Sequence, residues 1–302
     1  MSLDVGLLGH GRWGKRHLET LLVLKKSGKI NRIFVCDTDE KQLRNLPPLV
    51  DAAYSTPEEL FTTPSLDCVA IVTPPNTHLE LAAQAMQKNL PIFVEKPLSD
   101  RMDEVSRFLA NIRSNTTLIT GFLLRHHSGI KMIQHLLSEQ KIGALRELHY
   151  FRTTKRDKPE GAEAITTLAI HGFDLAILFG MNDMELANPH EFINRPAQMR
   201  FDASGPRKTR LFIDVSWNAV EEKRHLTLVG DKGNLILEFG TTPKLTLISN
   251  TATSEIPLTN EATPLALEWE YVLNSISSGQ PTVYPPIEDL LSLNSWLGVL
   301  RS

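Results

Sequence analysis

The sequence predicts two domains of different fold class. Residues 1–122 are expected to form an α/β domain with a doubly wound parallel sheet, and residues 123–302 an α+β domain with an open, mainly antiparallel sheet. In the first domain, strand-like runs alternate with helix-like segments, which is typical of a parallel sheet with right-handed crossovers. Between residues 192 and 249, strand-like runs follow one another without helices, which favours antiparallel pairing. A chain of 302 residues is also long enough for two domains.

The elements of the first domain follow from hydrophobic periodicity and from the positions of glycine and proline. The run at residues 67–73 is apolar over most of its length, as expected for a strand with both faces covered. Residues 76–88 place Leu79, Ala82, Ala83 and Met86 on one helical face. The expected strands cover residues 3–8, 32–37, 67–73, 91–95 and 117–122, and the expected helices residues 15–22, 39–45, 76–88 and 100–114.

The second domain is expected to contain long helices at both ends of a series of strands. Gly143 and Gly180 follow the helices expected at residues 125–140 and 163–179 and are expected to end them. The Asp-Lys-Gly-Asn sequence at residues 231–234 predicts a hairpin turn. The expected helices cover residues 125–140, 163–179, 265–277 and 287–300, and the expected strands residues 145–156, 192–202, 208–218, 224–229, 233–239 and 245–249.

Composition excludes several classes of partner. The formal net charge is −3, and no long basic run is present, so neither nucleic acid nor an anionic membrane is expected to bind. Cys36 and Cys68 are the only cysteines and lie in predicted buried strands, which argues against a disulfide framework. No segment resembles a signal peptide or a bilayer-spanning helix. A cytoplasmic location is therefore expected.

A glycine pattern follows the first predicted strand. Gly9, Gly11 and Gly14 form G-x-G-x-x-G between a strand and a helix, the context in which this pattern predicts dinucleotide binding. Gly9 permits a tight turn, Gly11 lets the backbone approach a pyrophosphate, and Gly14 lets the helix pack close to the strand. The pyrophosphate would lie at the positive end of the helix. We therefore predict a Rossmann domain whose cofactor is held by Gly9, His10, Gly11, Arg12, Trp13 and Gly14.

An ordinary βα turn can carry the same glycines, and Asp37 is the residue that counts against this interpretation. Asp37 ends the second predicted strand, at the separation expected for the carboxylate that binds the adenosine ribose. Because a carboxylate at this position repels a 2′-phosphate, the predicted cofactor is NAD in preference to NADP. Lys41 and Arg44 follow closely and weaken this preference.

Two further motifs follow predicted parallel strands, at the sheet edge where such folds bind ligands. The double proline of residues 73–78 makes a rigid turn, although the segment can also be read as a helix start with Asn76 as its N-cap. Lys96 directly follows a buried strand and can hold a positive charge beside a substrate hydroxyl, the alternative being a solvated loop lysine. The residues expected to line the cofactor here are Thr73, Pro74, Pro75, Asn76, His78, Glu95, Lys96 and Pro97.

These motifs, in this order, resemble the glucose-fructose oxidoreductase / inositol dehydrogenase / rhizopine-catabolism (Gfo/Idh/MocA) family. The resemblance covers the first domain, extends through Gly121, Phe122 and Arg125 to residues 142–145, and in the second domain depends mainly on residues 171–174. Members of the family are mostly NAD(P)-dependent dehydrogenases of sugars, cyclitols and related polyols. Their second domain has an open antiparallel sheet that often forms the subunit interface.

The resemblance also implies substrate-binding residues in the second domain. The family signature Asp-x-Gly-x-His-x-x-Asp corresponds here to residues 167–174, with Thr167 and Ala169 replacing the first aspartate and the glycine. Thr167 can form hydrogen bonds, but it cannot place a negative charge beside His171. The resemblance implies an acid/base role for His171, for which a purely structural histidine is the alternative. The expected substrate-binding residues are Lys96, Arg125, Thr167, His171 and Asp174, with Asp174 closer to a structural role.

Together these features predict an NAD-dependent dehydrogenase that acts on a secondary alcohol (CH–OH) of a sugar, cyclitol or similar polyol. His171 would take the hydroxyl proton as hydride leaves the same carbon, and Lys96 would stabilise the developing alkoxide. A non-catalytic dinucleotide-binding sensor of the same fold is the alternative that Thr167 keeps open. No metal is expected, because no Cys/His cluster has ligand spacing and the adjacent His126 and His127 point apart. A homodimer or homotetramer through the second domain's sheet is expected.

Overall fold

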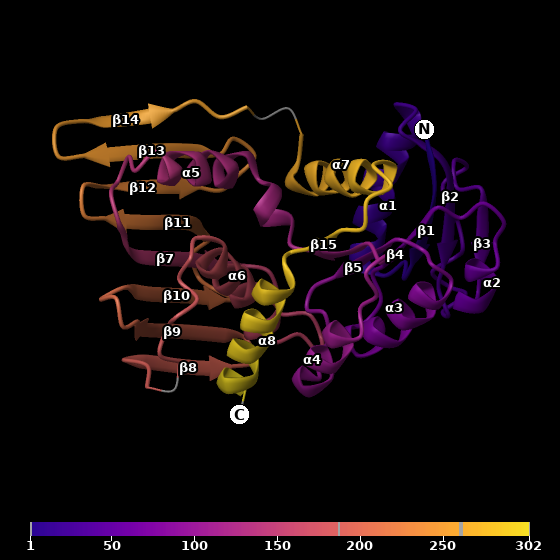
Figure 1. Ribbon diagram of the computed structural model, residues 1–302, viewed down its shortest axis with the longest axis horizontal. Helices are drawn as coiled ribbons and strands as arrows, with labels where there is room; N and C mark the ends of the chain where they lie inside the picture. The colour runs from indigo at the N-terminus through magenta and orange to yellow at the C-terminus, as the bar shows by residue number, and fades with distance from the viewer. Residues whose placement is uncertain (1, 187, 260–261, 302) are drawn as a thin grey trace. The chain divides into compact units, whose positions relative to one another are not determined.

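The chain forms two compact units whose boundary in sequence is crossed more than once. The computed structural model describes residues 2–186, 188–259 and 262–301. The first unit comprises Met1–Leu123 and Leu265–Leu290, and the second comprises Leu124–Pro264 and Leu291–Ser302. Residues 265–290 thus lie with the first unit, whereas the division expected at Phe122 assigned them to the second domain. Figure 1 shows the elements of both units.

The first unit is built on a seven-stranded parallel sheet with the order β15-β6-β5-β4-β1-β2-β3. Its strands are β1 (Leu3–Leu8), β2 (Ile30–Cys36), β3 (Ala52–Tyr54), β4 (Cys68–Ile71), β5 (Ile92–Glu95), β6 (Leu118–Gly121) and β15 (Val283–Tyr284). Its helices are α1 (Arg12–Lys26), α2 (Pro57–Phe61), α3 (His78–Gln87), α4 (Met102–Ala110) and α7 (Pro264–Ser277). The predicted doubly wound parallel sheet is confirmed.

The strand order reverses between β1 and β4, which are neighbours in the sheet although β2 and β3 lie between them in sequence. In open α/β sheets, ligands bind beyond the carboxyl ends of the strands at such a reversal. The glycine turn after β1 and the Thr73 segment after β4 both lie at this point.

Residues 265–290 join the first unit through side-chain packing and strand pairing. Trp269 of α7 is fully buried in the same apolar cluster as Leu18 and Leu21 of α1, and α7 lies beside α1 in Figure 1. Strand β15 then pairs with β6 through Val283 and Tyr284. An indole of this size buried against α1 stabilises the docking of α7, which no local pattern in residues 265–277 reveals.

The second unit is built on an eight-stranded sheet with the order β14-β13-β12-β11-β7-β10-β9-β8. Its strands are β7 (Leu145–Thr153), β8 (Glu191–Arg195), β9 (Gln198–Ser204), β10 (Arg210–Ser216), β11 (Lys223–Gly230), β12 (Gly233–Glu238), β13 (Lys244–Ser249) and β14 (Thr253–Ile256). Only β7 and β10 pair in parallel. The helices are α5 (Ser128–Ser138), α6 (Ile170–Leu178) and α8 (Ile287–Arg301), the last of which begins in the first unit. The predicted mainly antiparallel sheet is confirmed.

One face of the eight-stranded sheet is covered by α5 and α6 (Figure 1). Gly129 of α5 lies so close to Leu237 of β12 that a Cβ on the glycine would come within 2.5 Å of a leucine methyl group. Gly172 of α6 similarly approaches the ring of Tyr150 on β7, where a Cβ would lie 2.7 Å from Cδ1. Glycine at these two positions therefore lets both helices pack directly on the sheet.

Three predicted elements differ from the structure. Residues 39–45 form turns in place of a helix, because the carboxylates of Asp37 and Asp39 accept hydrogen bonds from backbone amides two residues ahead. The single strand expected at residues 192–202 is the β8–β9 hairpin, whose turn contains Pro196. The helix expected at residues 163–179 starts with a π-helical turn, Ile165–Ala169, before α6.

Within the described residues, no helix has an apolar stretch long enough to cross a bilayer.

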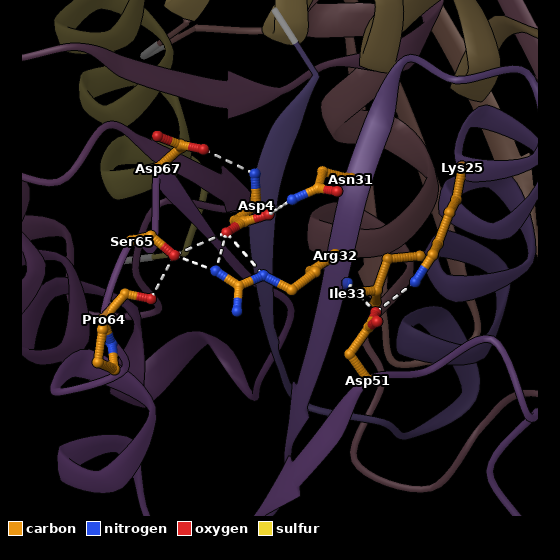
Figure 2. Close-up of polar contacts among 9 residues, drawn as sticks. All are labelled: Asp4, Lys25, Asn31, Arg32, Ile33, Asp51, Pro64, Ser65 and Asp67. Carbon is orange, nitrogen blue, oxygen red and sulfur yellow. Dashed lines mark hydrogen bonds and ion pairs between the residues drawn. The ribbon is translucent and has the colours of Figure 1, made fainter.

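A polar cluster stabilises the amino-terminal edge of the parallel sheet, opposite the edge that carries the ligand motifs. Figure 2 shows Asp4 at its centre. The buried Asp4 carboxylate accepts hydrogen bonds from Arg32 Nε at 2.9 Å, Asn31 Nδ2 at 2.8 Å and Ser65 Oγ at 2.9 Å. The Asp4 amide donates to Asp67 Oδ2 at 2.7 Å. Burial alone raises the pKa of Asp4, but these hydrogen bonds lower it below its ordinary value.

Replacing Asp4 with Asn should destabilise the protein by about 2 kcal/mol near neutral pH, because charge-assisted hydrogen bonds are lost. Since the folded-state pKa of Asp4 is depressed, its contribution is present above the ordinary value of 3.8 and is lost as the pH falls through the lower folded-state pKa. Urea unfolding of both proteins at pH 7 and at acidic pH measures the difference. The control Asp103→Asn, in an exposed pair with Arg107, should change little. An Asp4→Asn penalty that does not shrink in acid contradicts this account.

Candidate active site

The glycine turn between β1 and α1 is too closely packed for side chains at two of its glycines. Gly9 has a φ of +91°, a conformation that L side chains rarely adopt. A Cβ on Gly9 would lie 2.6 Å from the carbonyl oxygen of Val72, and a Cβ on Gly14 would lie 2.0 Å from that of Gly9. The approach of α1 to β1 and the contact with the end of β4 therefore require both glycines.

Gly11 differs from its neighbours, because a Cβ there would meet no atom within 4 Å. Gly11 is the N-cap of α1, and α1 has neither a side-chain hydrogen bond at this cap nor an acidic residue in its first turn. By contrast, α2 has a complete capping box formed by Thr56 and Glu59. Within the described part of the chain, the start of α1 thus combines uncapped amides with open space. This combination fits the diphosphate of a dinucleotide.

Asp37 follows β2 and contacts the glycine turn directly. Its Oδ2 accepts a hydrogen bond from the His10 amide at 2.7 Å, and its Oδ1 accepts one from the Asp39 amide at 2.9 Å. His10 is buried, and its Nδ1 donates to the carbonyl oxygen of Gln42 at 2.7 Å, since a carbonyl only accepts. His10 therefore acts through its backbone and by fixing the following turn. The half-buried Asp37 carboxylate retains lone pairs for a further donor such as a ribose hydroxyl.

The Thr73 segment is tied to the turn after β5 by His78. The buried His78 ring lies 2.8 Å from the Thr73 carbonyl oxygen through Nε2 and 2.9 Å from that of Pro97 through Nδ1. Burial lowers the pKa of His78, and the two carbonyl contacts oppose this shift, because a ring that donates to both oxygens must be protonated. His78 thus holds the two loops together, and exposed Asn76 is not the N-cap of α3, whose cap is Thr77.

Glu95 ends β5 inside a buried hydrogen-bonded network. Its Oε1 lies 3.0 Å from His17 Nε2, and the Trp269 indole donates to His17 Nδ1 at 3.0 Å. Because an indole N–H only donates, His17 Nδ1 must accept and Nε2 must carry the proton given to Glu95. Burial alone raises the pKa of Glu95, but the His17 hydrogen bond and the positive charge of Lys96 lower it, so the carboxyl is ionised.

Lys96 is half-buried, and its backbone amide donates to Glu95 Oε2 at 3.1 Å. Both oxygens of Glu95 are therefore engaged within the protein, one by α1 and one by the residue that follows β5. The sequence motif Glu95-Lys96-Pro97 thus contains a buried residue that fixes the loop and a more accessible lysine. Because β1, β4 and β5 are consecutive neighbours in the sheet, the structure brings the three predicted motifs of this unit to one edge.

In the second unit, Arg125 and Asp174 form a buried ion pair. Both side chains are 2% exposed, and Arg125 Nε and one of its terminal nitrogens each lie 2.8 Å from Asp174 Oδ1. A charge so buried is costly unless it is paired, so each residue requires the other. This pairing favours a structural role for Arg125 and Asp174 over direct recognition of a substrate.

Thr167 and His171 lie on the π-helical turn and on α6, respectively. Thr167 Oγ1 donates to the Glu163 carbonyl oxygen at 2.5 Å and accepts from the Trp217 indole at 3.2 Å. His171 is 5% exposed. π-Helical turns inside helices are frequent at functional sites, and here one immediately precedes the candidate acid/base residue.

Two residues of this network, His17 and Trp269, were not identified from the sequence. His17 falls on the buried face of α1 with Gly14, Leu18 and Leu21, so its place in the helical pattern is a usable signal. Trp269 is separated from His17 by 252 residues, and no local signal connects the two. Within the described chain, no group of three His, Cys, Asp or Glu side chains is placed to hold a metal ion.

Comparison with known proteins agrees with this geometry. Residues 3–122 match the family model described as an oxidoreductase family with an NAD-binding Rossmann fold. A myo-inositol 2-dehydrogenase of Thermotoga maritima is 30% identical over 185 residues, which are 58% of this chain and 54% of that protein. An uncharacterised oxidoreductase of Escherichia coli, YdgJ, is 28% identical over 191 residues, 60% of this chain and 54% of that protein. The chain spans about half the length of the curated relatives it matches.

Solved structures match the fold over the whole chain. The 3-ketoreductase KijD10 of Actinomadura kijaniata, in complex with TDP-benzene and NADP, has a TM-score of 0.84 at 17% identity, covering 100% of this chain and 98% of that one. An oxidoreductase of Agrobacterium radiobacter, in complex with NAD+, L-tartaric acid and magnesium, has a TM-score of 0.80 at 18% identity, covering 99% and 95%. Residues 3–122 thus match the model of the Gfo/Idh/MocA oxidoreductase family, and the solved structures show the same fold.

Proposed function

We propose that this protein is a dehydrogenase that transfers a hydride between a nicotinamide dinucleotide and a secondary alcohol of a sugar-like compound. The observation that carries this proposal is the uncapped, open start of α1 at Gly11, on the same sheet edge as Lys96. The similarity to a myo-inositol 2-dehydrogenase and to a 3-ketoreductase supports a polyol or sugar substrate.

The first unit is proposed to hold the cofactor. The backbone of residues 9–14 binds the diphosphate at the start of α1, Asp37 binds the adenosine ribose, and Thr73, Pro74, Pro75 and Asn76 line the nicotinamide half. His78 and Glu95 keep the two neighbouring loops in place through their buried hydrogen bonds. When bound, the nicotinamide supplies the site that accepts or donates the hydride.

Lys96 and His171 are proposed to handle the charge and the proton of the reacting hydroxyl. His171 accepts the hydroxyl proton, and the Lys96 ammonium stabilises the oxygen as negative charge develops on it. Glu95 accepts a hydrogen bond from the Lys96 backbone amide, which restrains the lysine at the end of β5. Within the second unit, the Arg125–Asp174 ion pair joins the segment before α5 to α6, the helix that carries His171.

A homo-oligomer formed through the uncovered face of the eight-stranded sheet completes the proposal. That face carries a cluster of half-buried rings, in which Phe151 lies 5.3 Å from Phe212 and 4.5 Å from His225 between ring centroids. Aromatic side chains of this kind are enriched in protein interfaces. A second copy of the sheet would remove them from water.

Gly11→Val should lower the unliganded protein's stability by no more than about 1 kcal/mol, because the side chain enters open space at a φ of −70° although valine is a poorer N-cap than glycine. It should weaken dinucleotide binding by about tenfold or more, which corresponds to about 1.4 kcal/mol. Thermal shift with NAD and NADP measures both effects, since a ligand at about a hundredfold excess over its Kd adds about 2.7 kcal/mol to the wild type. Gly240→Val, at another open position, is the control. Unaltered cofactor affinity in Gly11→Val excludes this binding mode.

Asp37→Asn should lower the preference for NAD over NADP by about tenfold, because the repulsion of the 2′-phosphate is removed. The single amide oxygen of Asn can accept the hydrogen bond from His10 but not also the one from Asp39, so circular dichroism should check that the variant is folded. Titration of wild type and variant with both cofactors gives the ratio of Kd values. Asp39→Asn makes the same charge change two residues away and should leave the ratio unchanged. A wild type that prefers NADP contradicts the proposed role of Asp37.

Lys96→Met and His171→Asn should each reduce kcat by about a hundredfold or more, the usual contribution of a positioned acid or base. Turnover is measured as the change in reduced-nicotinamide absorbance with a panel of sugars and cyclitols, and circular dichroism checks folding. Lys88→Met, an exposed lysine after α3, is the matched control. If both variants turn over at the wild-type rate, these assignments are wrong. If the wild type binds cofactor tightly but oxidises or reduces no member of the panel, a dinucleotide-binding sensor is favoured.

A further inference from the structure

The register of the second unit places two arginines side by side on the helix-covered face of its sheet. Arg224 of β11 lies directly opposite Arg152 of β7. On either side of them, the row continues with Val215 of β10 and with Phe239, whose amide donates to the Arg224 carbonyl oxygen. The adjacent row on the same face is buried and consists of Ile213, Tyr150, Leu226 and Leu237. The row that contains the two arginines is therefore next to the buried apolar row.

The charges of this arginine pair are not neutralised within the protein. Among the described residues, neither Arg152 nor Arg224 forms an ion pair with a carboxylate, and Arg224 Nε is buried without a hydrogen-bond partner. Arg224 instead lies over the ring of Phe239, 5.2 Å from its centroid. Burial, together with the positive charges of Arg152 and Arg156, lowers the pKa of Arg224 to about 10. Like charges placed directly opposite each other destabilise a strand pair.

The uncovered face of the same sheet shows the opposite arrangement. There Arg200 pairs with Asp214 at 2.8 Å, and Arg210 pairs with Asp202. On this face, neighbouring strands thus supply carboxylates to Arg200 and Arg210. The exposed Glu222 offsets the charge of Arg224 only in part.

A buried hydroxyl without a partner lies one row further in. Tyr150 is fully buried, and its hydroxyl has no hydrogen-bond partner among the described protein atoms. Its ring packs closely against Gly172 of α6, where a Cβ would lie 2.7 Å from Cδ1. An unsatisfied buried hydroxyl costs free energy unless a ligand or a water molecule supplies the missing bond.

Among the described residues, the π-helical turn Ile165–Ala169 contains no acidic residue. Trp217 follows Val215 by two residues, and its indole donates to Thr167. Thr167 occupies the position where the family signature has an aspartate. A carboxylate there would add negative charge to this region, and the threonine leaves the positive charge of the arginines undiminished.

We propose that Arg152 and Arg224, with the hydroxyl of Tyr150, bind an anionic group of the substrate, so that the enzyme acts on a phosphorylated or carboxylated sugar in preference to a neutral polyol. This inference rests on the proposed dehydrogenase function. Guanidinium groups bind phosphate and carboxylate oxygens through paired hydrogen bonds, and two of them on adjacent strands match a group with several oxygens. The ligand would supply the negative charge that no carboxylate among the described residues supplies to Arg152 and Arg224.

The test compares neutral sugars with anionic derivatives of the same stereochemistry on the cofactor-saturated protein. The probes are glucose against glucose 6-phosphate, glucuronate and UDP-glucose, and myo-inositol against inositol 1-phosphate. Isothermal titration should show at least one anionic probe binding about tenfold or more tightly than its neutral parent. The phosphomonoester, diphosphate and carboxylate arms identify which group is recognised.

Arg152→Met and Arg224→Met should each abolish this advantage, and Tyr150→Phe should reduce it, while binding of the neutral parent is unaffected. The control Arg195→Met removes an exposed arginine from the same sheet and should retain the advantage. The unliganded Arg152→Met protein should be as stable as the wild type or more so, because the repulsion across β7 and β11 is relieved. A purely structural arginine would instead lower the melting temperature when replaced.

The inference is overturned if the neutral parents bind as tightly as every anionic probe, or if no anionic probe binds. It is also overturned if the tighter binding of an anionic probe survives in both arginine variants. These results are separate from the dehydrogenase proposal, because binding is measured without turnover. Efficient oxidation of a neutral polyol would refute the anionic substrate and leave the dehydrogenase intact. Anion binding without hydride transfer to or from any probe would support the anion site and contradict the dehydrogenase proposal.

Discussion

The buried contact between His17 and Glu95 is the interaction on which the first unit depends. It joins α1, which begins at the glycine turn, to the last residue of β5, which is followed by Lys96. Trp269 completes it from α7, so that a segment near the end of the chain fixes the tautomer of a histidine near its beginning. Since Glu95 is ionised inside the protein, loss of His17 would remove a hydrogen-bond donor from a buried charge. The positions of the glycine turn and of Lys96 are therefore set by one network.

In the described part of this molecule, several charged groups with structural roles are paired within the protein, whereas the start of α1 and the Arg152–Arg224 pair lack a carboxylate partner. Asp4 at the amino-terminal edge of the parallel sheet is saturated with hydrogen bonds, and Arg125 and Asp174 neutralise each other inside the second unit. At the opposite edge, α1 begins without a cap, and in the second unit Arg152 and Arg224 face each other without a carboxylate among the described residues. Unpaired polar groups cost stability, so their concentration where ligands are expected indicates that binding supplies the missing partners.

Local sequence patterns predicted the secondary structure correctly wherever short-range interactions decided it. The alternation of strand and helix gave the parallel sheet, and Gly180, with a φ of +79°, ends α6 as expected. The failures have specific causes. The Asp37 and Asp39 side chains compete with helical hydrogen bonding over residues 39–45, and Pro196 divides a long apolar run into β8 and β9. Residues 265–290 were assigned to the wrong unit because Trp269 packs on α1 across the length of the chain.

The sequence by itself determined the two fold classes, the glycine turn with its terminal acid, and the family resemblance of residues 3–122, because each depends on residue types at short, fixed spacing. Only the tertiary structure decided the roles of individual side chains. It made His78 and Glu95 buried links between loops, paired Arg125 with Asp174, and set Arg152 against Arg224. Hydrogen-bond partners and strand register are long-range properties that arise from packing of the whole unit, so no local pattern encodes them.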